Sequence, residues 1–120
     1  MWGENAGKEI PRILIVVVVE ENRFLLRYII LEMGYQPILT ENGAQALKMV
    51  ERYALQLIIL DLALPVMDGY EVCQIVKANP VTREIPIIFI SAYDEASDIS
   101  KGFALGGEDY ITKQFIPVVV

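Results

Sequence analysis

Short apolar runs alternate with amphipathic segments along the whole of this chain. The segments between the runs carry apolar residues three and four positions apart, which is typical of helices. Strands that alternate with helices in this way indicate a parallel sheet covered by helices on both faces. The sequence therefore predicts an α/β protein with a doubly wound sheet of five parallel strands, at Ile13–Val19, Pro37–Thr40, Leu57–Leu60, Ile85–Ile90 and Tyr110–Ile111.

Four helices are expected between these strands, beginning near residues 20, 42, 68 and 94. The first has two glutamates in its opening turn, where negative charge complements the helix dipole. Its predicted apolar face includes Phe24, Leu25, Tyr28 and Ile29. Asp68 is expected to cap the third helix, because a carboxylate there can accept a bond from the first turn.

Length and composition exclude several classes of protein. The chain has 120 residues, which suits a single domain, and we expect residues 1–11 to be a frayed lead-in to a domain at 12–120. A net charge of −6 argues against direct binding to nucleic acid or to anionic membranes. The chain has no histidine and one cysteine, Cys73, which excludes histidine-based triads and an internal disulfide. The composition fits a cytoplasmic protein.

Three polar side chains follow the predicted strands at the same edge of the sheet. Asp61 ends the third strand, Ser91 follows the fourth, and Lys113 follows the fifth. Because ligands of such sheets bind beyond the carboxyl ends of the strands, we expect these side chains to share one crevice. A carboxylate can attack phosphorus to form an acyl phosphate, while a hydroxyl and an ammonium can hold the phosphoryl oxygens. We also predict a direct salt bridge between Asp61 and Lys113.

The sequence around Asp61 carries a family resemblance. The segment Leu57–Gly69, together with the spacing to Ser91 and to Asp109–Lys113, resembles the receiver domain of bacterial response regulators, the CheY-like superfamily. The resemblance covers about residues 12–115. It implies a flavodoxin-like fold and a role in a two-component phosphorelay. The expected partner is a histidine kinase or phosphotransfer protein, with an output domain possible in a longer protein.

The resemblance also implies a role for each matching residue. Asp61 would be the phosphoacceptor, and Ser91 and Lys113 would bind the phosphoryl group. Tyr110, together with Ser91, would act in the switch that follows phosphorylation. The backbone carbonyl of Ala63 and the carboxylate of Asp61 would be ligands of Mg²⁺.

Two valines depart from the family pattern where it has a pair of acidic residues. These residues organise Mg²⁺ in the family, whereas this chain has Val17 and Val18. Because Mg²⁺ needs oxygen ligands in octahedral geometry, we expect weak or no binding and slow or absent phosphorylation. Glu20 or Glu21 reaching into the crevice is the weaker alternative.

The end of the chain differs as well. Gln114 stands where the family usually has proline, and the sequence ends at Val120. We therefore expect the fifth helix of the family to be absent, which would favour self-association through uncovered apolar surface. The valines at 17–19 and 118–120 lead to the hypothesis of a substituted and shortened receiver.

Other functions remain open at this stage. The main alternative is a receiver-like interaction module that works without phosphorylation, and Val17 and Val18 favour it. An aspartate-nucleophile phosphatase is disfavoured, because such enzymes need a second aspartate where Ala63 stands. A nucleotide-binding protein is disfavoured because no glycine-rich loop follows the first strand. The chain is not expected to be an enzyme: a phosphoacceptor signalling domain would show at most weak autophosphorylation and autodephosphorylation.

Overall fold

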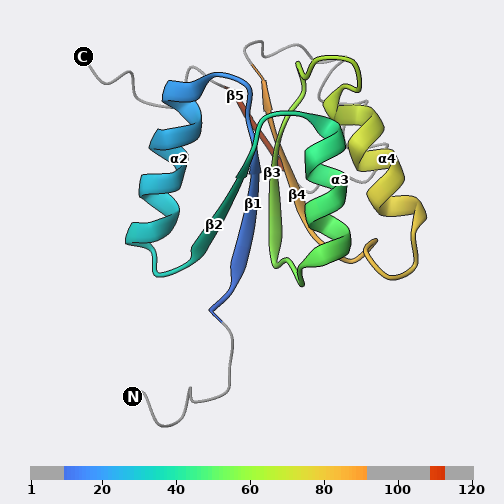
Figure 1. The fold of residues 1–120 in the computed structure, drawn as a ribbon, viewed down its shortest axis with the longest axis horizontal. Coiled ribbons are helices and arrows are strands. Elements are labelled where there is room, and N and C mark those ends of the chain that lie inside the picture. The colour runs from blue at the N-terminus through green and yellow to red at the C-terminus, as the bar shows by residue number, and fades with distance from the viewer. Residues whose placement is uncertain (1–9, 92–108, 113–120) are drawn as a thin grey trace, which may run out of the picture.

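The computed structural model describes residues 10–91 and 109–112 of the chain, shown in colour in Figure 1. Five strands form one parallel sheet in the order β2-β1-β3-β4-β5. Their bounds are Arg12–Val16 (β1), Gln36–Thr40 (β2), Leu57–Asp61 (β3), Ile87–Ser91 (β4) and Asp109–Thr112 (β5). The doubly wound parallel sheet predicted from the sequence is confirmed.

Three described helices cover the sheet, with α2 on one face and both α3 and α4 on the other (Figure 1). They span Glu20–Glu32 (α2), Gly43–Arg52 (α3) and Gly69–Ala78 (α4). Asn42 caps α3 through a bond from the Gln45 amide, and Asp68 caps α4 through a bond from the Glu71 amide. The predicted capping role of Asp68 is therefore confirmed. No helix in the described ranges is long and apolar enough to cross a membrane.

Alternate residues of the central strands supply two separate cores. Leu14 and Val16 of β1 belong to the core beneath α3 and α4, whereas Ile13 and Ile15 belong to the core beneath α2. All four side chains are buried, as expected for a central strand with both faces covered. The central strands are therefore packed on both faces, and Asp61 lies at the end of one of them.

The first strand is shorter than its apolar run predicted. β1 ends at Val16, and Val17–Val19 form the connection to α2. Val17 remains fully buried in the core beneath α2, but Val18 and Val19 are exposed. An unbroken run of valines carries no turn signal, so the sequence could not show where the strand stops. β4 also begins later than predicted, at Ile87, after Pro86.

The predicted apolar face of the first helix is wrong in part. Phe24, Tyr28 and Ile29 are exposed on α2. Its buried residues are Arg23 and Ile30. Arg23 is tolerated there because its guanidinium finds several polar partners, described below. Gly34 follows the helix with φ of 88°, a backbone conformation that glycine adopts readily and that is common just after the end of a helix.

Some predictions concern residues outside the described ranges. These are the frayed lead-in, the fourth helical segment at 94–105, Lys113 with its salt bridge to Asp61, Gln114 and the absence of a fifth helix. They stay predictions.

Candidate functional site at the carboxyl edge of the sheet

Asp61 is buried at the end of the central strand β3. Its exposed fraction is 0%, and its side chain accepts two backbone hydrogen bonds. The Val18 amide donates to Oδ2 at 3.3 Å, and the Ala63 amide donates to Oδ1 at 3.1 Å. Hydrogen bonds to an ionised carboxylate are stronger than those between neutral groups. The two connections that follow β1 and β3 therefore hold this carboxylate in place at the carboxyl edge.

Gly69 brings the start of α4 against the backbone at Asp61. The Gly69 amide donates to the Leu62 carbonyl at 3.1 Å. A Cβ atom at position 69 would overlap the Asp61 carbonyl oxygen and would lie 2.9 Å from the Cα of Leu62. Only a residue without a side chain allows this approach, so Gly69 sets the shape of the connection beneath the carboxylate.

Arg23 supports the β1–α2 connection, which contacts Asp61 through the Val18 amide. Its Nη1 donates to the carbonyls of Val17 and Val18 at 2.9 and 3.1 Å. Its Nη2 lies 3.9 Å from a Glu20 carboxylate oxygen and 3.7 Å from one of Glu41. The guanidinium thus joins the β1–α2 and β2–α3 connections.

The sequence reasoning missed Arg23. The available signal was its position seven residues before Ile30, which places both side chains on one face of α2. A charged residue on a buried helix face needs partners, and those partners come from the backbone of the neighbouring connection.

The other predicted phosphoryl-binding and switch residues are placed only by their backbone. In the parallel register, Asp61 pairs with Ile90, Ser91 pairs with Thr112, and Phe89 pairs with Tyr110. The ends of β3, β4 and β5 therefore lie side by side at one edge, as the sequence predicted. The side-chain roles of Ser91 and Tyr110 stay predictions.

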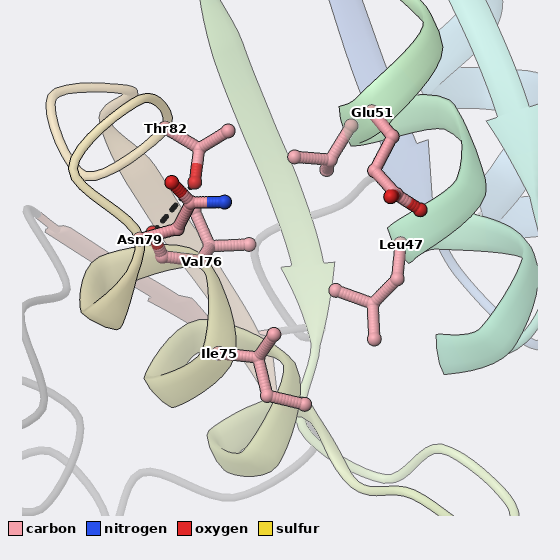
Figure 2. A pocket seen from close by; sticks show the side chains of 7 residues that line it. Leu47, Glu51, Ile75, Val76, Asn79 and Thr82 are labelled. Atoms are coloured by element: carbon pink, nitrogen blue, oxygen red, sulfur yellow. Dashed lines mark hydrogen bonds between the residues drawn. The ribbon is translucent and has the colours of Figure 1, made fainter.

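An apolar groove lies elsewhere on the described surface, between α3 and α4. It has a volume of about 250 Å³ and is lined mainly by Leu47, Val50, Ile75 and Val76, with Glu51 at its side (Figure 2). These residues lie between the middle and the end of each helix, whereas α4 starts against the backbone of Asp61. The groove is therefore separate from Asp61, which does not line it.

Comparison with known proteins identifies the family. The family model of the response regulator receiver domain matches residues 13–119. The chain belongs to the response regulator receiver family. It is thus a signalling domain of two-component systems, as the resemblance implied.

Individual relatives are similar over nearly all of the chain. A probable transcriptional regulator of Cyanidium caldarium is 36% identical over 95% of this chain and 45% of its own length. The chain therefore spans less than half of that relative. The crystal structure of the receiver domain of a signal transduction histidine kinase from Syntrophus aciditrophicus is 34% identical, with a TM-score of 0.78, over 86% of this chain and 78% of its own.

A metal-bound receiver allows a comparison with the donor set of this chain. The receiver domain of a sensor histidine kinase from Pseudomonas aeruginosa, crystallised with magnesium coordinated in its active-site cleft, is 30% identical, with a TM-score of 0.81, over 89% of this chain and 88% of its own. In this chain Val17 and Val18 offer no side-chain oxygen, and both Asp61 oxygens accept backbone amides. The described ranges contain no group of three or more His, Cys, Asp or Glu that could hold a metal.

The described residues therefore do not fit a magnesium site of the usual kind. Mg²⁺ demands six oxygen ligands in near-ideal geometry, usually from carboxylates, carbonyls and water. Glu20, one of the weaker candidates, has its carboxylate near Arg23 instead. Ala63 is exposed, and the role of its carbonyl as a ligand stays a prediction.

Proposed function

We propose that Asp61 is the phosphoacceptor of this receiver domain, taking a phosphoryl group from the phosphohistidine of a partner kinase or phosphotransfer protein. The observation that supports this most directly is the carboxylate itself. It is buried, lies at the carboxyl edge of the central strand, and is held by two backbone amides. Membership of the receiver family supports the same role.

The proposed step is a displacement at phosphorus. A carboxylate oxygen of Asp61 attacks the phosphorus atom, and a new O–P bond forms as the N–P bond of the phosphohistidine breaks. The electron pair of the broken bond stays on the imidazole nitrogen, and the product is an acyl phosphate. Ser91 and Lys113 are proposed to hold the phosphoryl oxygens, and Tyr110 and Ser91 to act in the subsequent switch.

We further propose that phosphorylation of the unaltered chain is slow or absent. Phosphoryl transfer depends on neutralising the charge that develops on the phosphoryl oxygens. Val17 and Val18 bring no carboxylate to this edge, so the site lacks two of the ligands that would recruit a cation. Weak binding of Mg²⁺ follows from the same absence.

A second candidate function is an interaction module that works without phosphorylation. Val17 favours it, because this side chain is fully buried among Ile13, Ile15 and Ile30 and thus belongs to the core. A partner would then recognise a fixed surface of the domain. A second copy of the chain is one partner that this proposal includes.

The setting of the domain is also a proposal. A relative more than twice as long is named a transcriptional regulator, so we propose an output domain in a longer protein, with any contact to nucleic acid or membrane made outside this domain. We place the protein in the cytoplasm, where a kinase domain can reach it.

Phosphate uptake from a small donor tests the proposal. The unaltered chain, the Val17→Asp/Val18→Asp variant and that variant with Asp61→Asn are incubated with acetyl phosphate and Mg²⁺, and intact masses are recorded. We expect a gain of one phosphate in the double variant, little or none in the unaltered chain, and none once Asp61 is replaced. Uptake that survives Asp61→Asn would refute the phosphoacceptor role. No uptake by the double variant would favour the interaction module.

A further inference from the structure

The Val17–Val18 peptide group lies between a cation and the carboxylate of Asp61. Arg23 Nη1 donates to the carbonyl of this peptide, at Val17 O, over 2.9 Å. The amide of the same peptide, at Val18 N, donates to Asp61 Oδ2 over 3.3 Å. In a trans peptide the carbonyl and the amide point in opposite directions, so one planar group contacts Arg23 on one side and Asp61 on the other.

We propose that Arg23 is a positioning residue for the Asp61 carboxylate, acting through the Val17–Val18 peptide. A rotation of this peptide would remove the Val18 amide from Oδ2. By binding the carbonyl, Arg23 opposes that rotation. The reaction concerned is the phosphoryl transfer of the proposed function, so the catalytic consequence of this inference rests on that proposal.

Electrostatics strengthen the same arrangement. A cation at a carbonyl oxygen polarises the peptide and makes its amide a better donor, because linked hydrogen bonds reinforce one another. Burial increases this effect, and the Arg23 side chain is 11% exposed. Arg23 thus strengthens the hydrogen bond to Asp61 by polarising the Val17–Val18 peptide. These are the two positions where the family has acidic residues.

The second nitrogen of the guanidinium explains why Arg23 stays in this position. Nη2 faces the carboxylates of Glu20 and Glu41, while Nη1 also holds the Val18 carbonyl. The two carboxylates are exposed, so each pair stabilises the fold little. Together the two ion pairs favour one orientation of the Arg23 guanidinium. A lysine has a single ammonium group and could not bind the carbonyls and the carboxylates in the same geometry.

The Val18 amide gives a direct readout by NMR spectroscopy. Hydrogen exchange and the proton chemical shift of this amide are measured in the unaltered chain, Arg23→Gln, Arg23→Lys and Arg27→Gln. Arg27 is the matched control, because it is an exposed arginine one turn further along α2. We expect Arg23→Gln to speed Val18 exchange about tenfold relative to the β1 and β3 amides. Arg23→Lys should give an intermediate value and Arg27→Gln no change.

Two results would overturn the inference. One is an unchanged Val18 exchange rate and shift in Arg23→Gln. The other is faster exchange at all strand amides by the same factor, which would show that Arg23 serves stability alone.

If Arg23→Gln does not fold, the inference can be tested by changing Asp61 and observing Arg23. Asp61→Asn removes the charge that the peptide contacts, so the Arg23 guanidinium proton resonances should shift. Asp68→Asn, which changes an aspartate that caps α4, should leave them unchanged. Arg23 guanidinium resonances that do not shift in Asp61→Asn would refute coupling through the peptide.

Phosphate uptake in the Val17→Asp/Val18→Asp background separates this inference from the proposed function. An altered Val18 amide in Arg23→Gln, with no uptake in any variant, would support the positioning and refute the phosphoacceptor role. Unaltered amide properties with uptake that requires Asp61 would refute only the positioning.

Discussion

Neighbouring residues at the carboxyl edge have opposite surroundings. Val17 is 0% exposed and packs in the core beneath α2, whereas Val18 is 39% exposed and contributes its backbone amide to Asp61. The apolar side chain at position 17 therefore stabilises the core. At position 18 the main-chain amide binds the Asp61 carboxylate. Substitutions at these two positions should have different effects, even though the residues are identical.

Gly69 provides a stability prediction at the same scale. In Gly69→Ala the new methyl group would overlap the backbone at Asp61 and Leu62, which cannot easily move. We expect the free energy of unfolding to fall by about 2 kcal/mol, as for other overpacked sites. Urea denaturation followed by circular dichroism measures it.

Gly43→Ala is the matched control, because both glycines are the first residue of a helix. Its Cβ would lie 3.0 Å from Val72 Cγ2 and 3.2 Å from the Met67 carbonyl oxygen, so the overlap is smaller than at Gly69. The change should cost less than about 1 kcal/mol, since alanine also favours the helix over glycine. Equal losses at both glycines would contradict the argument from backbone overlap.

The helices differ in how their first turns are satisfied. Asn42 and Asp68 cap α3 and α4 with side-chain oxygens, whereas Val19 precedes α2 and offers no such bond. The start of α2 has instead two glutamates in its first turn. These carboxylates interact favourably with the helix dipole.

Replacing the residue before each helix should therefore lower the free energy of unfolding by different amounts. We expect Asn42→Ala and Asp68→Ala each to lower the free energy of unfolding by about 1 kcal/mol. Val19→Ala should change it by less than about 0.5 kcal/mol, because no cap bond is lost. Thermal denaturation of the three variants measures the differences, and a loss at Val19 as large as at Asn42 would contradict the role of the caps.

The parallel sheet, as a whole, brings distant connections together. Val18 and Asp61 lie 43 residues apart in sequence, yet β1 and β3 are adjacent strands and end at the same edge. Arg23 then ties this edge to the β2–α3 connection through Glu41. Charge at positions 17 and 18 should therefore affect the stability of the whole domain.

Mg²⁺ should stabilise the Val17→Asp/Val18→Asp variant only. Without metal we expect this variant to be less stable by about 2 kcal/mol or more, because an aspartate at position 17 would be desolvated in the apolar core beneath α2. Free Mg²⁺ at about ten times its Kd should restore about 1.4 kcal/mol, since it binds the folded state.

The melting temperatures of the unaltered chain and of the double variant are measured in Ca²⁺-free buffer, once with EDTA and once with Mg²⁺. The unaltered chain should melt at the same temperature in both conditions. An equal rise in its Tm with Mg²⁺ would show that Val17 and Val18 do not prevent metal binding.

The sequence alone determined the elements and the position of the carboxylate. Local periodicity distinguished strands from helices, and the apolar strand that ends in Asp61 placed this residue at the edge of a parallel sheet. The missing oxygen ligands at positions 17 and 18 were also visible directly, because they depend only on residue identity.

Only the tertiary structure decided which groups contact the carboxylate. Periodicity favoured Phe24 and Tyr28 as core residues, but the sheet contacts the face of α2 that carries Arg23 and Ile30. Arg23 and Asp61 are linked by hydrogen bonds to the two ends of one backbone peptide. Every residue type except proline has the same backbone donor and acceptor. The chain sequence therefore cannot show this contact, because the path of the backbone creates it.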